Sequence, residues 1–374
     1  MPNRILLVTP ASPFKLQSGG QQRTALLFEA LSRLGPVDVL LLEPGTQRAV
    51  ADSPDPRILA QARWHSMPLG IAKYRSDAEL TRQINERASL SYYDLIVGRY
   101  LNPICKLDLP QHAQTLVDLD DWGYHYGGNA CWTPKSILAH VKSTYAQILA
   151  RRQLKRFDAF YFVSDQDKAS EPCLKSEVLP NIPFAPPRAA LPQSDSKNII
   201  FVGALWYGPN REGVEHFLKH CWPGIRANVP DATLTLVGGA SPSVRTVWAK
   251  LPGVQAPGFV DDLGVAYEDA AIAIAPIDYG GGTNIKILES LAYGRACVTT
   301  PRCANALREN LHPGEGLVVA ENDAQWIEWC TKLLTDSQER AKIANSGHAI
   351  VTVSYTKTRF IDAAVRLANN IINA

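Results

Sequence analysis

Buried strands and amphipathic helices alternate along this chain in two successive series, and this alternation constrains the fold more than any other feature. The first series opens with the apolar run 5–9, which is typical of a strand covered on both faces. Apolar residues at helical spacing follow at 23–34, and the run 37–44 again has the composition of a buried strand. Strands that alternate with helices in this way form parallel sheets with right-handed crossovers. The first series therefore predicts a doubly wound α/β domain.

The alternation starts again after a proline-rich segment. Residues 179–198 hold five prolines and a polar stretch without periodicity, which is typical of an interdomain linker. We therefore expect a Rossmann-like N-terminal domain at 1–180, a linker at 181–197 and a Rossmann-like C-terminal domain at 198–354. A last amphipathic helix within 355–374 has no strand after it, and we expect it to pack back on the N-terminal domain. The two doubly wound domains are expected to face a common cleft.

The composition excludes several classes of protein. With 38 basic and 36 acidic residues the net charge is only +2, and no basic block stands out, which argues against a nucleic-acid partner. No window reaches about 18 uncharged apolar residues, so no membrane span is expected. The N-terminal apolar run is too short for a signal peptide. Seven cysteines without a CxxC pair argue against zinc and fit a reducing compartment, so we expect a cytoplasmic protein.

A glycine-rich turn runs directly into a helix at 280–292. The glycines at 280–282 let the backbone approach a ligand, and Thr283 or Asn284 can cap the helix, whose start favours anions. Lys286 and Glu289 lie three residues apart on one helix face. A diphosphate at the helix start would leave its ribose about one turn away, within reach of the glutamate. The pattern suits a nucleotide diphosphate, although a capped helix with a surface Lys–Glu pair fits the spacing equally well.

The same segment carries a family resemblance. "GGGTNIKILESLAYGRACVTT" (280–300) resembles the donor-binding signature of GT-B glycosyltransferases of the large retaining group called family 4, which includes bacterial polysaccharide and lipid glycosyltransferases. "NIIFVGALWYGPNREGVEHFL", "PDATLTLVGG", "GVQAPGFVDDL" and "LHPGEGLVVAENDAQWI" match in the same order, and together the matches cover nearly all of 198–350. Over the first 180 residues the resemblance is thinner and rests on "SGGQQR", "DLDDW" and "RFDAFYFVSDQD".

The resemblance implies a GT-B hexosyltransferase-like enzyme that moves a sugar from a UDP- or GDP-sugar to an acceptor with retention of the anomeric configuration. We expect neither a metal nor a cofactor. Glu289 matches the glutamate that binds the donor ribose, and Lys286 is expected at the diphosphate or sugar. The turn residues Gly281, Gly282, Thr283 and Asn284 complete the donor site. Many members have a glutamate that contacts the donor sugar eight positions before Glu289, where this chain has Gly281.

Three further places in the second domain match donor-binding segments of the family. Gly203 ends the first strand of that domain, and Ala204 replaces the basic residue that usually follows it. Arg211 is therefore the cation we expect at the phosphates, with a solvated arginine at a helix start as the alternative. The segment containing Phe259 and Val260 resembles the one whose backbone meets the nucleotide base. Asp261 or Asp262 after it is expected to cap the next helix.

In the first domain, Gly19 and Gly20 resemble the glycine turn that approaches the donor phosphates or the acceptor. Asp118 and Asp120 form a DxD pattern at the end of a strand, which in another glycosyltransferase fold holds Mg²⁺ or Mn²⁺. Because a separate phosphate turn is present, we interpret Asp120 instead as a catalytic cleft residue that faces the sugar or the acceptor hydroxyl. Aspartates that cap the next loop are the alternative.

The acceptor is not named by the sequence: a growing polysaccharide or other saccharide, a lipid-linked sugar and a small molecule stay open. A basic cluster at the end of the helix 135–157 is either a peripheral contact with the inner face of the membrane or a solvated helix end; it consists of Arg151, Arg152, Lys155 and Arg156. Two other functions stay open, a non-catalytic nucleotide-sugar-binding protein of the same fold and a nucleotide-sugar epimerase. An oxidoreductase is disfavoured because "SGGQQR" is not GxGxxG.

Overall fold

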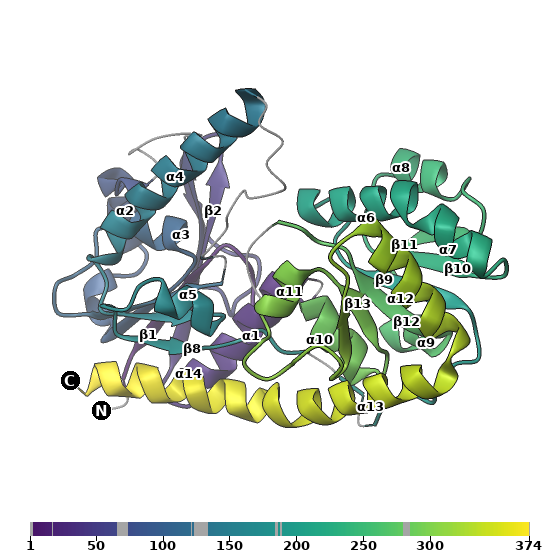
Figure 1. Cartoon of the computed structure of the whole chain (residues 1–374). Coiled ribbons are helices and arrows are strands. Elements are labelled where there is room, and N and C mark those ends of the chain that lie inside the picture. The colour runs from purple at the N-terminus through teal and green to yellow at the C-terminus, as the bar shows by residue number, and fades with distance from the viewer. Residues whose placement is uncertain are drawn as a thin grey trace. The chain divides into compact units, whose positions relative to one another are not determined.

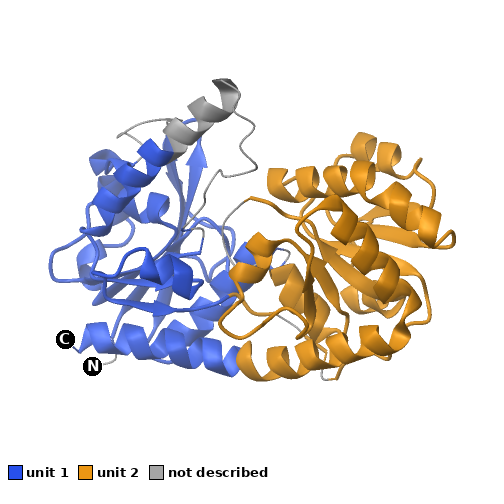
Figure 2. Cartoon of the chain, viewed as in Figure 1, with its two compact units in different colours: residues 1–126, 130–180, 357–374 blue, residues 127–129, 181–356 orange. Residues whose placement is uncertain are grey.

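The chain divides into two compact units, which Figure 2 shows in two colours. Unit 1 comprises residues 1–126, 130–180 and 357–374, and unit 2 comprises residues 127–129 and 181–356. The structure is a computed structural model that describes residues 3–16, 18–65, 74–120, 122, 134–183, 186–187, 189–279 and 285–373. Both units are mixed α/β, each built on one sheet with helices packed against it (Figure 1).

Unit 1 contains a sheet whose described strands follow the order β3-β4-β2-β1-β5-β6-β7-β8. β3 is antiparallel to β4, and the other pairings are parallel. The strands are β1 (Ile5–Thr9), β2 (Val37–Gly45), β3 (Ala49–Ala51), β4 (Ala60–His65), β5 (Leu95–Arg99), β6 (Gln114–Leu119), β7 (Ala159–Phe162) and β8 (Ser176–Val178). All five residues of β1 are buried, as expected for a strand covered on both faces.

The helices of unit 1 connect these strands, and the last one comes from the end of the chain. They are α1 (Gly19–Leu31), α2 (Ala78–Asn85), α3 (Leu101–Cys105), α4 (Pro134–Leu154), α5 (Asp165–Ala169) and α14 (Lys357–Ile372). α14 packs alongside α1 and β8 (Figure 1). Its Phe360 and Ile361 are buried, and its Ala364 carbonyl accepts a hydrogen bond from the Tyr161 hydroxyl on β7. The prediction that the C-terminal helix joins the N-terminal domain is confirmed.

Helix α1 begins four residues earlier than the sequence pattern predicts. The apolar spacing predicts a helix from residue 23, but the structure has it from Gly19. Ser18 explains the difference, because its extended backbone and its hydroxyl, which accepts from the Gln21 amide at 3.4 Å, form an N-cap. Gly19 and Gly20 therefore lie in the first helical turn and not in a loop before the helix.

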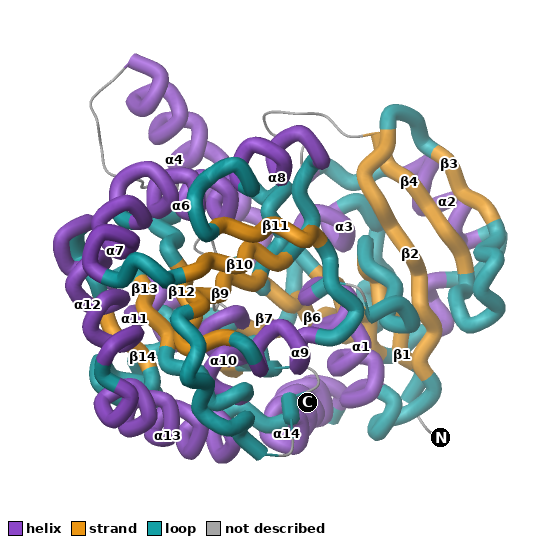
Figure 3. The backbone as a smooth tube through the Cα atoms, turned by 90° about the vertical axis from the view of Figure 1, so that its right-hand side faces the viewer, coloured by secondary structure: helices purple, strands orange, loops and turns teal. Residues whose placement is uncertain are grey.

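Unit 2 contains a parallel sheet whose described strands follow the order β11-β10-β9-β12-β13-β14. Figure 3 shows β11, β10, β9 and β12 side by side. The strands are β9 (Asn198–Val202), β10 (Thr233–Val237), β11 (Val254–Gly258), β12 (Ala270–Ala275), β13 (Cys297–Thr299) and β14 (Leu317–Val319). Their side chains and those of the helices form one apolar core that includes Phe201, Leu236 and Ile274. Burial of each such side chain stabilises the fold by about 1.5–3 kcal/mol.

The helices of unit 2 alternate with these strands. They are α6 (Gly208–His220), α7 (Trp222–Asn228), α8 (Pro242–Trp248), α9 (Leu263–Glu268), α10 (Ile285–Ala292), α11 (Pro301–Asn305), α12 (Asp323–Thr335) and α13 (Ser337–Ser354). The spacing of apolar residues at 211–225 predicts a single helix, but the structure has the two helices α6 and α7 there. Cys221 serves as C-cap of the first and N-cap of the second, and Pro223, in the first turn of α7, cannot donate the hydrogen bond of a continuous helix.

Two buried arginines attach the connecting segment to unit 2. Arg295 Nη1 donates to the Leu191 carbonyl at 3.2 Å, and Arg340 Nη2 donates to the Ser194 carbonyl at 2.9 Å. Both guanidinium groups are almost fully buried and donate to backbone carbonyls. The expected linker 181–197 thus contains residues that are bound directly to the second unit.

Each sheet reverses its strand order at one point. In unit 1 the reversal lies between β1 and β5, and in unit 2 it lies between β9 and β12. Crevices at such points, outside the carboxyl ends of the strands, are where doubly wound domains bind ligands. Among the described residues no helix combines the length and apolar character that crossing a membrane requires.

Candidate functional site

The carboxyl ends of β9 and β12 meet at the reversal point of the unit 2 sheet. β9 leads into Gly203 and β12 leads into the segment 276–279. This segment is anchored through the Ile277 carbonyl, which accepts from the Thr300 hydroxyl at 2.7 Å and from the Cys303 thiol at 3.3 Å. The next residues, 280–284, lie outside the described residues, and with them the predicted ligands Gly281, Gly282, Thr283 and Asn284. α10 begins directly after them.

Helix α10 brings Lys286 and Glu289 to this point of the sheet. Ile287, Leu288 and Leu291 are fully buried and fix the helix against the core. Lys286 and Glu289 lie on its first two turns and are half-buried. Lys286 reaches Gly203, because a Cβ placed at residue 203 would lie 3.2 Å from the Lys286 Cε. The structure therefore brings together three of the predicted donor-binding residues, from β9 and α10.

Burial changes the ionisation of both charged groups on α10. It raises the pKa of Glu289 to about 7, against the opposing effect of the Lys286 charge. It also lowers the pKa of Lys286, although Cys303, Cys297 and Glu289 act in the other direction. Both groups are thus poorly hydrated in the unliganded protein. A ligand that supplies hydroxyl groups to the carboxylate and phosphate oxygens to the ammonium would replace the hydration that they have lost.

The other predicted donor residues of unit 2 occupy the same edge of the sheet. Phe259 follows β11 and is 68% exposed, and Val260 next to it is half-buried. Asp262 accepts from the Gly264 amide at 2.7 Å as the N-cap of α9, which confirms one of the two predicted caps. Arg211 lies exposed on the first turn of α6, so its expected contact with phosphates stays a prediction.

Sequence reasoning missed one aromatic residue at this edge. Trp206 is 72% exposed, and its indole lies over Gly239, where an added Cβ would be 3.4 Å from the Trp206 Cδ1. Its ring is also in an edge contact with Tyr207. The signal that would have found it is a tryptophan three residues after the glycine that follows a strand, since exposed tryptophans are uncommon outside contact surfaces.

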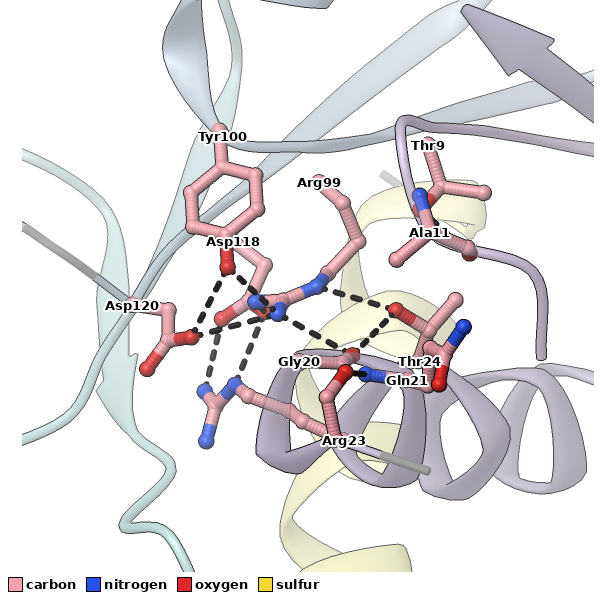
Figure 4. A network of polar contacts seen from close by, with 11 residues as sticks. Thr9, Ala11, Gly20, Gln21, Arg23, Thr24, Arg99, Tyr100, Asp118 and Asp120 are labelled. Atoms are coloured by element: carbon pink, nitrogen blue, oxygen red, sulfur yellow. Dashed lines mark hydrogen bonds and ion pairs between the residues drawn. The ribbon is translucent and has the colours of Figure 1, made fainter. Parts of the chain in front are cut away.

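Unit 1 holds a second group of charged residues, at the carboxyl edge of its own sheet (Figure 4). Asp118, on β6, accepts from Arg23 of α1 through two bonds, Nε to Oδ2 at 2.9 Å and Nη2 to Oδ1 at 2.6 Å. Arg99 of β5 donates to Asp118 Oδ2 through Nη1 at 2.5 Å and to Asp120 Oδ2 through Nη2 at 3.1 Å. The reversal point of the unit 1 sheet therefore carries a network of two ion-paired arginines and two aspartates.

The members of this network differ in burial. The side chains of Arg23, Arg99 and Asp118 are 2%, 0% and 0% exposed, whereas that of Asp120 is 16% exposed. Burial alone would lower the pKa of Arg99, but Tyr100, Asp118 and Asp120 together raise it above its usual value. Asp118 therefore serves as the buried counter-ion of two arginines. Asp120 is the outermost carboxylate of the network.

Tyr100 joins the network through an unusual backbone conformation. It has φ 65° and is the one residue other than glycine in the described part of the chain with a positive φ. In this conformation its amide donates to the Asp118 carbonyl at 3.0 Å, and its hydroxyl lies 3.1 Å from Arg99 Nη2 and 3.4 Å from Asp120 Oδ2. Such conformations cost about 1–3 kcal/mol and persist where the surroundings enforce them.

Gly20 of α1 contacts the network from the other side. The Gly20 carbonyl accepts from the Thr24 hydroxyl at 2.7 Å and lies 3.5 Å from Arg99 Nη2. A Cβ at residue 20 would lie 3.6 Å from the Tyr100 hydroxyl, whereas one at Gly19 would meet no atom within 4 Å. Gly20 therefore contacts the network that contains Asp120, and its expected approach to the donor phosphates or the acceptor stays a prediction.

The basic cluster at the end of α4 is partly paired within unit 1. Arg151 Nε donates to Glu171 Oε1 at 2.6 Å, and Arg156 Nη1 lies 3.3 Å from the Tyr74 carbonyl.

The described residues contain no group of three or more histidine, cysteine or carboxylate side chains arranged to hold a metal ion. His216, one of a pair on α6, bonds to Asp323 at 2.8 Å.

Comparisons with known proteins point to one fold. Residues 196–336 match the family model described as "Glycosyl transferases group 1". Sucrose-phosphate synthase from Thermosynechococcus elongatus has a similar structure, with a TM-score of 0.69 at 16% identity over 99% of both chains. The Anabaena protein HepE in complex with UDP gives 0.65 at 14% identity over 100% of both chains. A UDP-forming α,α-trehalose-phosphate synthase from Burkholderia xenovorans gives 0.63 at 12% identity, also over 100% of both.

No curated protein sequence is significantly similar to the chain. The solved structures nevertheless align with the whole of it, and they share the two Rossmann-like domains that the sequence predicts. The family model covers β9 to α12, the part of the chain that carries Gly203, Lys286 and Glu289. Residues 196–336 therefore match a group 1 glycosyl transferase domain, and the chain as a whole has the GT-B fold of these solved structures.

Proposed function

We propose that the protein transfers a sugar from a nucleoside diphosphate donor to a hydroxyl group of a saccharide, lipid-linked or small-molecule acceptor, with retention of configuration and without a metal. The observation that carries this proposal is the position of Lys286 and Glu289. They lie half-buried on the first turns of α10, beside Gly203, at the point where the unit 2 sheet reverses its strand order. Doubly wound domains bind nucleotides at this point.

In this proposal Glu289 accepts hydrogen bonds from the ribose hydroxyls, and Lys286 together with the start of α10 holds the diphosphate. The rise is 1.5 Å per residue in a helix, so these two side chains are separated by about one turn, close to the span from a diphosphate to its ribose. A carboxylate that accepts two hydroxyl hydrogens forms charge-assisted bonds, which are roughly twice as strong as neutral ones. The half-buried position of both groups strengthens their electrostatic interactions with the ligand.

The transfer itself requires stabilisation of the departing diphosphate. The acceptor hydroxyl attacks the anomeric carbon on the face from which the diphosphate leaves, and a diphosphate oxygen takes the hydroxyl proton. Lys286, helped by Arg211 and by the helix start, compensates the charge that develops on the leaving group. Asp120 of unit 1 holds a hydroxyl group of the acceptor or of the transferred sugar.

The pairing of the unit 1 carboxylates with arginines supports a reaction without a metal. A DxD metal site needs carboxylate oxygens that are available to a divalent cation. Both oxygens of Asp118 accept hydrogen bonds from buried arginines, and Asp120 is paired with Arg99. A metal ion here would have to displace the guanidinium groups of Arg23 and Arg99. These groups already compensate the negative charge of the carboxylates.

UDP is the first nucleotide to test. HepE was solved with UDP, and the trehalose-phosphate synthase neighbour is UDP-forming. The melting temperature should rise with UDP or one of GDP, ADP and TDP, because a ligand that binds the native state stabilises it by mass action. Consumption of the matching nucleotide sugar should then be lost in Glu289→Ala, with EDTA having no effect. Binding without turnover across donors and acceptors would instead indicate a nucleotide-sugar-binding protein, and activity that EDTA abolishes would contradict metal independence.

A further inference from the structure

Helix α10 is short, so its end lies close to the charged residues near its start. It has eight residues, and Ala292, the last of them, follows Glu289 by three positions and Lys286 by six. With a rise of 1.5 Å per residue, these separations are about 4.5 and 9 Å along the axis. Isolated helices of this length are unstable in water, so tertiary contacts fix the place of α10. The contacts of its last turn therefore also determine where the two charged side chains lie.

The carbonyl groups in the last turn of α10 have partners of two kinds. The last four carbonyls of a helix lack partners within the helix. The Ser290 carbonyl accepts from the Arg295 amide at 2.8 Å, and the Leu291 carbonyl accepts from the Gly294 amide at 2.9 Å. Gly294 has φ 73°, a conformation that commonly ends a helix. The Ala292 carbonyl accepts from a side chain of another helix, α13.

His348 is the side chain that α13 contributes. α13 packs alongside α10 (Figure 1), and the imidazole of His348 is half-buried there. Its Nδ1 lies 3.0 Å from the Ala292 carbonyl oxygen and 3.3 Å from that of Leu291. Because carbonyl oxygens only accept hydrogen bonds, Nδ1 carries the hydrogen and donates to both. His348 thus satisfies carbonyl groups that the end of a helix leaves open.

Two glycines let the backbone of α13 come close to α10 beside this histidine. A Cβ at Gly347 would lie 2.5 Å from the Gly316 Cα and 2.9 Å from the Leu291 Cδ2. A Cβ at Gly316 would lie 2.3 Å from the Gly347 Cα. Only residues without a side chain fit at these separations. The backbone that carries His348 is therefore in direct contact with the segment before β14 and with α10, which gives the imidazole a fixed base.

We propose that His348 is a positioning residue for the nucleotide donor. Through its hydrogen bonds to the last turn of α10, it determines where this helix holds Lys286 and Glu289. His348 acts on the donor only through the helix. The inference rests on the proposed function and deepens it, because it names a residue outside the donor site on which donor affinity depends.

The test separates the hydrogen bond of His348 from the volume of its side chain. His348→Leu removes the donor and keeps a side chain of similar size, whereas His348→Asn retains an N–H group at the position of Nδ1. Calorimetry measures the affinity for UDP-glucose, or for the glucose derivative of whichever nucleotide binds. This affinity should fall roughly fivefold or more in His348→Leu and stay within about twofold of wild type in His348→Asn.

Trp222→Phe is the matched control in unit 2. Trp222 Nε1 donates to the Pro252 carbonyl at 3.0 Å, so this variant also loses one hydrogen bond from a side chain to the backbone, on α7. It should lower the melting temperature and leave the donor affinity unchanged. Circular dichroism verifies that each variant is folded at the temperature of the titration.

Three results would overturn the proposal. They are wild-type affinity in His348→Leu, a loss in His348→Asn as large as that in His348→Leu, and an equal loss in Trp222→Phe.

The ionisation of Glu289 provides a readout that needs no ligand. Burial raises the pKa of Glu289 to about 7, and this burial depends on the place of α10. Release of the last turn gives water access to the carboxyl group, so its pKa should fall towards the usual value of 4.5 in His348→Leu and stay near 7 in Trp222→Phe. Carbon-13 NMR of the side-chain carboxyl follows the titration, and Glu289→Gln assigns the signal.

An unchanged pKa of Glu289 in His348→Leu would show that the histidine only stabilises the fold, and the proposal would be wrong. If no nucleotide sugar binds to the wild type, the proposed function fails, while this titration still decides whether His348 positions Glu289.

Discussion

Gly203, at the end of β9, faces the aliphatic part of Lys286 on α10: a Cβ at residue 203 would lie 3.2 Å from the lysine Cε. Contacts of this length are tighter than ordinary van der Waals contacts, and Phe201 Cζ at 3.1 Å and Asn210 Nδ2 at 3.2 Å crowd the same position, so the lysine is one of three side chains that would have to move. A valine at position 203 would displace it further, away from the place where we expect the diphosphate. Gly203→Val should therefore weaken binding of UDP-sugar by roughly tenfold, about 1.4 kcal/mol.

Calorimetric titration of the Gly203 variant is the measurement for this prediction. Gly239→Ala is a matched control on the neighbouring strand end, because its Cβ would make an ordinary 3.4 Å contact with Trp206. The control should bind nearly as the wild type does. Equal affinities for the Gly203 variant and the wild type would show that Lys286 does not hold the donor.

The raised pKa of Glu289 predicts how donor binding depends on pH. Burial raises this pKa to about 7, so at pH 6 most molecules carry the neutral acid and at pH 8 most carry the carboxylate. If the carboxylate is the form that binds ribose, affinity should increase between pH 6 and 8 by up to about tenfold and then level off. A nucleotide sugar suits this measurement because its diphosphate is esterified at both ends and lacks the phosphate ionisation near pH 6 of a monoester.

Glu289→Gln is the control for this pH dependence. The variant should bind the donor roughly 10–100-fold more weakly at pH 8, because a charge-assisted hydrogen bond contributes about 1.5–3 kcal/mol, and its affinity should be flat between pH 6 and 8. Titrations in two buffers of different ionisation enthalpy should show proton release at pH 7 in the wild type alone. A wild-type affinity that does not change with pH would contradict the assigned role.

The same carboxyl group should lower the stability of the unliganded protein at high pH. Its folded pKa lies above the usual value of 4.5, so the folded state binds more protons than the unfolded state between these two values. The free energy of unfolding should therefore fall as pH rises from about 4.5 through 7. The difference between wild type and Glu289→Gln in denaturant titrations isolates this contribution. A wild-type stability that rises with pH relative to that of Glu289→Gln would have the wrong sign.

Removal of the charge of Asp118 should strongly destabilise unit 1. Asp118→Asn leaves two buried guanidinium groups without their shared counter-ion, and breaking a buried ion pair in this way costs about 3–5 kcal/mol. The exposed pair of Arg33 and Asp362 provides the comparison, with side chains 52% and 60% exposed. Asp362→Asn should cost less than about 1 kcal/mol. Urea unfolding followed by circular dichroism measures both, and similar costs would show that the network contributes little.

The backbone of Tyr100 permits a matched test of strain. Tyr100→Ala and Tyr100→Gly both remove the phenol ring and differ by one Cβ. Because φ is 65°, the alanine variant keeps a strained backbone and the glycine variant does not. The glycine variant should be more stable than the alanine variant by about 1 kcal/mol, although glycine ordinarily costs entropy. A more stable alanine variant would show that the backbone relaxes when the ring is removed.

The sequence pattern predicted the two α/β units because central strands such as β1 and β12 are continuous apolar runs and helices such as α10 have a regular apolar stripe. It also predicted Glu289 and Lys286 as neighbours, since helical spacing alone relates them. The start of α1 was wrong by four residues because a single hydroxyl, that of Ser18, decides it. The division between α6 and α7 was missed because the apolar spacing continues across Cys221.

The network of unit 1 could not be predicted, because its four charged members come from three elements that are separated by many residues in the chain. Asp118 and Asp120 were noticed as a pattern, but their partners Arg23 and Arg99 lie 95 and 19 residues before Asp118. The available signal was Arg99 itself, an arginine that ends an otherwise apolar strand. The positive φ of Tyr100 has no counterpart in the sequence, since tyrosine does not favour that conformation.

The last helix of the chain has a consequence for biosynthesis. Phe360 packs near the Arg23 guanidinium, 5.4 Å from ring centre to carbon, and Ala364 receives the Tyr161 hydroxyl. These contacts can form only after α14 has left the ribosome, and α14 follows residues 181–356 of unit 2 in the chain. Apart from residues 127–129, unit 2 is continuous from residue 181 to 356 and can complete its core during translation. The first unit to be synthesised is therefore the second to be finished, and until residues 357–372 arrive its buried arginine lacks an aromatic cover.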